Sequence, residues 1–198
     1  MRTLTQTTSQ TIQAVNSIAC PGATAGTTTA NNYYRVFDLP AMGISGAFTV
    51  TKVSFQIEHC RPTSGSTCTN VAVRVGTYTG TPGATLATAS MIILASNATV
   101  PVPTVLEDSN AMTTPGGTVD APISATIPAG SKLLVEVDAP DTGTYAFYMG
   151  SNTSGESGFG YVMAPNRCNI TVPSNISGVL GQTPAAPRHL LLTVTGTY

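Results

Sequence analysis

Charged side chains are scarce in this sequence. Asp, Glu, Lys and Arg together make up 9% of its 198 residues, against roughly a quarter in an ordinary soluble domain. Eight basic and nine acidic residues give a formal net charge of −1, and no cluster of Lys or Arg occurs that could neutralise a run of phosphates. We therefore expect no nucleic-acid partner.

Long apolar runs and helical periodicity are missing as well. The longest apolar runs, such as residues 91–95 (MIILA), are far shorter than the roughly 20 residues that span a bilayer, so we expect no membrane insertion. No segment of ten or more residues repeats apolar side chains at helical spacing. The amino terminus lacks the apolar stretch of a secretory signal; either a signal was removed and a start Met added, or the native protein never carried one.

Threonine, alanine, glycine and proline crowd every segment instead. β-Branched residues suit a pleated, half-buried surface, and Gly with Pro supplies turns. A chain of this length buries a proper core, and all-β sandwiches of this size form one domain. The composition therefore predicts an all-β fold: a single-domain, jelly-roll-like antiparallel β-sandwich over residues 17–198, preceded by a polar arm at 1–16 and carrying a long loop-rich segment near the C-terminus.

Period-two alternation marks the expected strands. Within 47–59 the parity of the apolar positions changes between Val50 and Val53, which predicts a β-bulge near Thr51 and Lys52. Gly- and Pro-rich turns separate the strands. We expect strands at 33–39, 47–59, 70–78, 85–95, 99–106, 118–127, 132–138, 144–150 and 188–197, and a loop-dominated segment at 151–187 with only a weak strand at 161–163.

Four cysteines allow three pairings. Cys60 and Cys68 flank the turn RPTSGST, which favours a Cys60–Cys68 disulfide and leaves Cys20 to pair with Cys168. Disulfides indicate an oxidising space outside the cytoplasm. Four buried free thiols are the alternative, and a zinc site is disfavoured because no short paired Cys spacing is present.

Signals of catalysis are weak. His59 and His189 are the only histidines available as a base, but the glycines of residues 155–160 (GESGFG) have the wrong offsets for a nucleophile elbow, so a flexible turn is the simpler interpretation. Glu136 and Asp138 share one strand face, as a glycosidase pair would, although solvated strand-face charges explain them well. We expect no enzyme activity, with a secreted hydrolase as a remote alternative.

Oxygen-rich turns offer candidate calcium ligands. Asp138, Asp141 and the Gly143 carbonyl form one group, because hard cations take several oxygens from a turn. A second oxygen-rich group comprises Asn31, Asn32 and Asp38. A structural Ca²⁺ is the only cofactor that these residues suggest, and charges solvated on a strand remain the alternative.

Carbohydrate binding is a second function class. Trp, the commonest stacking platform for sugars, is absent. Tyr34, Tyr145, Tyr148 and Tyr161 could replace it, although a tyrosine on a strand more often packs in the core or across strands. The segment 151–187 would complete such a site, because long loops on rigid scaffolds often carry binding.

Three strings occur together: NNYYRVFDL (31–39), IPAGSKLLVEV (127–137) and FYMGSNTSG (147–155), followed by Cys168 and the terminal HLLLTVTG. Together they resemble a β-sandwich module of secreted, often multidomain, bacterial surface proteins. The resemblance covers most of the chain beyond about Ser17. It implies a jelly-roll-like fold and an extracellular setting, and it brings no catalytic residues.

These observations favour interaction over catalysis. We expect a non-enzymatic extracellular structural or binding module that assembles into a larger particle or surface array, either as a phage virion decoration or tail-surface protein or as a bacterial surface protein. Its partners would be other protein chains, including copies of itself. Residues 1–13 could add a strand to a neighbour's exposed sheet edge. A glycan is the alternative partner.

Overall fold

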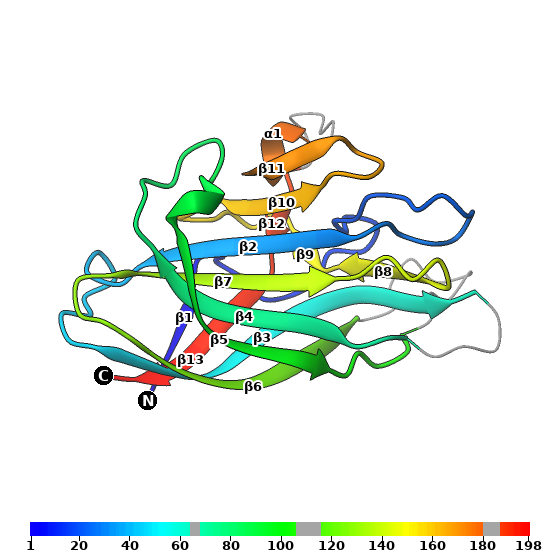
Figure 1. The fold of residues 1–198 in the computed structure, drawn as a ribbon. Helices are drawn as coiled ribbons and strands as arrows, with labels where there is room; N and C mark the ends of the chain where they lie inside the picture. Colours follow the sequence, from blue (N-terminus) through cyan, green and yellow to red (C-terminus); the bar gives the residue numbers. More distant parts are fainter. Residues whose placement is uncertain (64–67, 106–115, 180–186) are drawn as a thin grey trace.

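Two antiparallel sheets packed against each other make up most of the chain (Figure 1). The computed structural model describes residues 1–63, 68–105, 116–179 and 187–198. The first sheet runs in the order β1 (Arg2–Thr5), β13 (Leu192–Thr197), β3 (Phe48–Pro62) and β6 (Gly117–Ile127), and β8 (Tyr145–Met149) also pairs with β3. The predicted all-β sandwich is confirmed.

The second sheet has six strands in the order β11 (Ile170–Asn175), β10 (Gly160–Ala164), β2 (Asn31–Asp38), β7 (Lys132–Ala139), β4 (Val71–Tyr78) and β5 (Met91–Val100). A two-stranded ribbon joins β9 (Ser151–Asn152) to β12 (His189–Leu190). Helical structure in the described residues is limited to one 3₁₀ turn, η1 (Thr88–Ser90), and one α-helical turn, α1 (Ile176–Val179).

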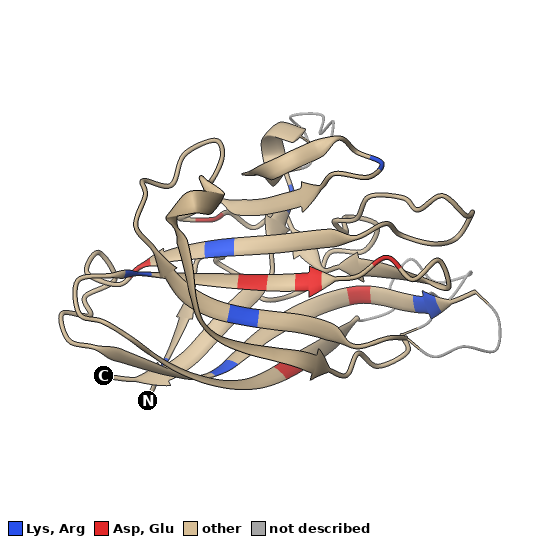
Figure 2. Cartoon of the chain, viewed as in Figure 1, with Lys and Arg blue, Asp and Glu red and all other residues tan. Residues whose placement is uncertain are grey.

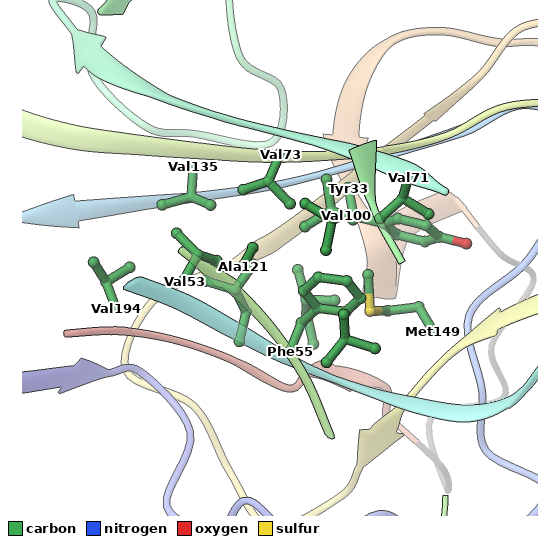
Figure 3. Close-up of a cluster of buried hydrophobic side chains, with 14 of the residues drawn as sticks. Tyr33, Val53, Phe55, Val71, Val73, Val100, Ala121, Val135, Met149 and Val194 are labelled. Carbon is green, nitrogen blue, oxygen red and sulfur yellow. The ribbon is translucent and has the colours of Figure 1, made fainter. Parts of the chain in front are cut away.

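The core lies between the two sheets (Figure 3). Val53 and Phe55 of β3 face Val73 of β4 and Val135 of β7, and all four side chains are almost completely inaccessible to solvent. Each such side chain contributes roughly 1.5–3 kcal/mol by leaving water. Since Val is the commonest residue of this core, the strand preference of the sequence and the packing of the core agree.

Two bulges interrupt the long strand β3. The register of β3 against β6 shifts between Val50 and Lys52, which confirms the bulge predicted from the change of parity. A second shift, against β8, lies between Ile57 and His59. It leaves Glu58 as the extra residue, and the sequence analysis did not anticipate it.

One predicted strand pair is wrong. The chain forms a single strand, β5, where strands at 85–95 and 99–106 were expected, and η1 precedes it. The polar residue Asn97 does not end the strand, because its side-chain amide donates to the Pro122 carbonyl at 3.0 Å and its oxygen accepts the Thr99 N–H at 3.2 Å. Residue 106 lies outside the described residues.

The segment 151–187 is more ordered than predicted. It contains β9, β10, β11 and α1, and β10 pairs with both β2 and β11. Tyr161 and Val162 of β10 are buried, so pairing and packing at the sheet decide a strand that local sequence hardly signals. Residues 180–186 of this segment, and residues 64–67 of the turn between the paired cysteines, lie outside the described residues.

The amino-terminal arm belongs to the first sheet of its own chain. β1 pairs antiparallel with β13, and Leu4 is 1% exposed. Thr7 then bridges to Glu156, and Ile18 bridges to Met149. In this structure the arm therefore completes the molecule's own sandwich, which the polar composition of residues 1–16 did not indicate.

Both predicted disulfides are present, Cys20–Cys168 and Cys60–Cys68, each with 6.1 Å between the Cα atoms. All four cysteines are therefore paired, and the alternatives of free thiols and a zinc site are wrong. Two disulfides indicate a secreted or otherwise oxidising environment. Across the described residues, no helix is long and apolar enough to cross a bilayer.

Candidate functional site

The edge strands β1, β5, β6 and β11 differ in how they are protected. Edge strands expose unpaired N–H and C=O groups, and short length, proline or a covering loop prevents unwanted pairing. β1 has only four residues, β6 contains Pro122, and β11 contains Pro173 and is covered by backbone hydrogen bonds from Ala84 and Leu86. β5 has ten residues without a proline or a charge.

The first half of β5 exposes a run of three large apolar side chains. Ile92, Ile93 and Leu94 are 50%, 43% and 46% exposed, and we call them the β5 patch. Figure 2 shows that no charged residue lies on this strand. The second half of β5 approaches β6, where Asn97 bonds to Pro122. The pairing of β5 with β4 is interrupted by two register shifts. The β5 patch thus combines an edge position with exposed apolar area, a combination typical of interaction sites.

Charges on the second sheet form a cross-strand network. Arg74 of β4 pairs with Glu136 at 2.9 Å and with Asp138 at 3.0 Å, both on β7. Asn32 and the Tyr34 hydroxyl of β2 also donate to Glu136. The two carboxylates do share a face, as predicted, but Glu136 is buried rather than solvated, because Arg74, Asn32 and Tyr34 replace water around it.

A pocket of about 330 Å³ lies at the second bulge of β3. His59 stands opposite Tyr148 of β8, and their ring centroids are 3.9 Å apart. We name this space the bulge pocket and define it by six of its lining residues: Val15, Glu58, His59, Arg61, Tyr148 and Arg188. Bulges often occur beside binding sites, because they redirect side chains.

Glu58 is the residue that the bulge redirects, and it is only 8% exposed. Its Oε1 atom accepts the N–H of Val15 at 2.5 Å. Its Oε2 atom is buried and has no hydrogen-bond partner among the described residues. A buried acceptor without a donor costs about 1–3 kcal/mol, and more when it is charged. Glu58, which lines the bulge pocket, therefore has a buried oxygen without a donor among the described residues.

Val15, which holds the other oxygen of Glu58, has a φ of 60°. A β-branched residue rarely adopts this left-handed conformation, and such strain often occurs at functional sites. Two cationic side chains also line the pocket, Arg61 and Arg188. Neither makes an ion pair within the part of the chain that the structure describes.

Three of the four predicted sugar-stacking tyrosines are buried. Tyr34, Tyr145 and Tyr161 are at most 3% exposed, so their rings offer no face to a ligand. Burial raises the pKa of all three, to about 12 for Tyr161. Tyr148 is half-buried and lines the bulge pocket. The sequence analysis missed Glu58 because alternation alone does not reveal a bulge one residue after a core position.

The predicted calcium ligands are occupied by protein groups. Asp138 pairs with Arg74, and Asp141 accepts the N–H of Gly143 and the hydroxyl of Thr29. In the second predicted group, Asn31 bonds to Cys20 and Thr29, and Asp38 accepts the N–H of Ala41. Within the described ranges, no group of three or more His, Cys, Asp or Glu side chains could hold a metal ion.

The segment 155–160 is anchored rather than a flexible turn. Nδ1 of His189 accepts the N–H of Gly155 at 3.0 Å. Glu156 pairs with the buried Arg35 at 3.0 Å, and Arg35 also donates to the Gly158 carbonyl. Burial raises the pKa of Glu156 against the opposing effect of Arg35. These contacts give His189 and Glu156 structural partners.

The fold and the contacts define the chain as a disulfide-bonded, all-β sandwich protein. No protein-family model matches it, and no curated protein matches it. The β5 patch and the bulge pocket therefore carry the functional argument.

Proposed function

We propose that this protein is a non-enzymatic extracellular structural module that assembles with copies of itself through β5. One observation carries the proposal: β5 is a ten-residue edge strand without charge or proline, while the edge strands β1, β6 and β11 are short, interrupted by proline or covered. A long edge strand without charge or proline supports the use of that edge as an interface.

A second copy of the chain is the partner that β5 fits best. Two β5 strands related by a two-fold axis would pair antiparallel, each satisfying the free N–H and C=O groups of the other. Since β5 carries no charge, the two copies would bring no like charges together. Ile92, Ile93 and Leu94 would leave water in both copies, which adds a hydrophobic contribution to the backbone hydrogen bonds.

The setting that we propose is a larger particle or surface array outside the cytoplasm. The two disulfides support an oxidising environment. Resemblance of the strings at 31–39, 127–137 and 147–155 to a module of bacterial surface proteins supports a surface role. A phage virion decoration or tail-surface protein and a bacterial surface protein both fit this proposal.

The proposal is tested by measuring the molar mass of the protein against concentration with size-exclusion chromatography and light scattering. We expect dimers or larger assemblies that dissociate in the Ile93→Lys variant, because a charge on the β5 patch would meet its own copy. Ser124→Lys is the matched control, since Ser124 is exposed on the protected edge strand β6. A wild-type protein that is monomeric at every concentration, or a variant that assembles unchanged, would contradict the proposal.

A second function, saccharide binding, is favoured by a separate observation. The half-buried ring of Tyr148 lines a pocket in which Oε2 of Glu58 lacks a donor among the described residues. This candidate does not involve β5, so both functions can belong to one molecule.

A further inference from the structure

The bulge pocket differs in one respect from a larger pocket beside Phe159. The larger pocket, about 410 Å³, lies beside Phe159 and includes Gln6 and Glu156. Both of these polar side chains are already bonded to Arg35. At the bulge pocket, by contrast, Oε2 of Glu58 has no donor within the part of the chain that the structure describes. A ligand gains most where it satisfies a buried group that the protein leaves unpaired.

The ligand must first supply a hydrogen-bond donor to Glu58. Carboxylates accept strong, charge-assisted hydrogen bonds from hydroxyl groups. Val15 already donates to Oε1 and strand pairing holds β3 against β8, so Glu58 is preorganised and loses little freedom on binding. A hydroxyl-bearing molecule satisfies this requirement without placing a second charge beside Glu58.

The ring of Tyr148 adds a second requirement. It is held by the stack on His59 and by its place on β8, and part of it remains exposed along the pocket. A fixed aromatic ring presents a large amphipathic surface at little entropic cost. The C–H face of a sugar ring matches such a surface, and a pocket of about 330 Å³ lies within the size range of small-molecule sites.

The two arginines determine the charge of the ligand. Arg61 and Arg188 both line the pocket, and among the described residues Glu58 is the one carboxylate that lines it. The formal charge of the lining is therefore positive, with His59 counted as neutral. Guanidinium groups bind carboxylates in a bidentate manner. An anionic group on the ligand would pair with one of them, while its hydroxyl groups reach Glu58.

We propose that the bulge pocket binds a carboxylated pyranose, the unit of acidic polysaccharides and of sialylated glycans. A ring hydroxyl donates to Oε2 of Glu58, the C–H face of the ring packs on Tyr148, and the ligand carboxylate pairs with Arg188. This inference rests on the second function above and specifies its ligand class. It does not depend on assembly through β5.

The test is an NMR titration of the ¹⁵N-labelled protein with matched pairs of glycosides. Methyl galactopyranosiduronic acid is compared with methyl galactopyranoside, and methyl glucopyranosiduronic acid with methyl glucopyranoside. N-acetylneuraminic acid forms a separate arm that distinguishes a sialylated source. We expect saturable shifts at the amides of Val15, His59 and Tyr148 with at least one acidic probe, which binds about tenfold or more tightly than a neutral sugar.

Variants assign the contacts. Glu58→Gln should weaken binding about tenfold or more, because a neutral amide oxygen is a weaker acceptor than a carboxylate. Arg188→Gln should reduce the preference for acidic over neutral sugars while keeping the fold, since Arg188 is only partly buried and makes no ion pair with a described residue. Asp120→Asn is the control, because its carboxylate is exposed on β6, and it should bind like the wild type.

Three results would overturn the inference: no saturable shift with any acidic probe, shifts that map outside the bulge pocket, or an unchanged affinity in a Glu58→Gln variant whose spectrum shows an intact fold. If the substitution at Glu58 prevents folding, the Arg188→Gln variant serves as the test. An unchanged preference of this variant for acidic over neutral sugars counts against the proposal. Ile93→Lys is titrated in parallel and should bind like the wild type. Assembly and saccharide binding can therefore fail separately.

Discussion

Arg35 and Glu156 form an ion pair of 3.0 Å although 121 residues separate them in the chain. The side chain of Arg35 is completely inaccessible to solvent, and that of Glu156 is 11% exposed. The same guanidinium donates to the carbonyl groups of Gly158 and Leu190 and to the side chain of Gln6. One buried cation therefore connects β2 to the residues after β1, to the segment before β10 and to β12.

Removal of the negative partner should destabilise the fold strongly. Glu156→Gln leaves Arg35 buried without its counter-charge, and breaking such a pair costs about 3–5 kcal/mol. Asp120→Asn is the control, since its pair with Lys52 is exposed and such pairs are worth about 0–1 kcal/mol. Urea unfolding measures both. Equal losses in the two variants would contradict a special role for the buried pair.

High pH should unfold the protein through its buried tyrosines. Burial is the main cause that raises the pKa of Tyr33, Tyr34, Tyr145 and Tyr161, whereas an unfolded chain ionises its tyrosines near pH 10. Since the folded pKa is the higher one, the stabilising contribution is complete below about pH 10 and is lost as the pH rises through the folded value, about 12 for Tyr161.

The measurement is the denaturation midpoint as a function of pH, together with phenolate absorbance. We expect the midpoint to fall above about pH 10 and the absorbance of the buried tyrosines to appear in the same step as the loss of the β-sheet circular dichroism signal. Tyr161→Phe should reduce the pH dependence. If all tyrosines ionise gradually while the sheet signal persists, the burial argument is wrong.

The two disulfides should contribute unequally to stability. Cys60–Cys68 closes a separation of 8 residues and Cys20–Cys168 one of 148. The chain-entropy relation gives about 2.5 kcal/mol for the short loop and about 5 kcal/mol for the long one. Paired Cys→Ala variants, unfolded in urea, measure each contribution. A larger loss for the short loop would show that strain or residual structure, rather than loop entropy, dominates.

The first strand should be needed for stability. Leu4 of β1 is 1% exposed, so Leu4→Ala should cost about 2–5 kcal/mol through the cavity that it leaves. Thr3→Ala is the control on the same strand, since Thr3 is exposed and should change stability by no more than about 0.5 kcal/mol. Chemical unfolding compares the two variants. An unchanged free energy of unfolding in Leu4→Ala would indicate that β1 does not stabilise its own chain.

Local pattern was sufficient for several features. Period-two alternation predicted β4, and a change of parity predicted the bulge between Val50 and Lys52. The disulfide Cys60–Cys68 followed from a short turn between two cysteines. These features depend on residues that are close together in the sequence. They can be predicted because side chains alternate between the two faces of a strand.

Other features depend on groups that are distant in sequence. Asn97 remains inside β5 because Pro122 accepts its hydrogen bond, and β10 exists because β2 and β11 pair with it. The same applies to the candidate sites: the sequence suggested four stacking tyrosines, and three of them are almost completely buried, whereas Tyr148 is partly exposed at the bulge pocket. Glu58 was missed because its bulge is visible only in the pairing of β3 with β8.

Composition and periodicity thus determined the class of this protein: a strand-rich sandwich with little charge and paired cysteines, because pleated strands and turns impose these preferences locally. Tertiary structure alone decided which edge stays open, that Arg35 meets Glu156, and that Glu58 retains an oxygen without a partner among the described residues. The physical reason is that the pairing of edge strands and the pairing of buried charges involve segments far apart in the chain. Local residue preferences do not include the free energies of these long-range contacts.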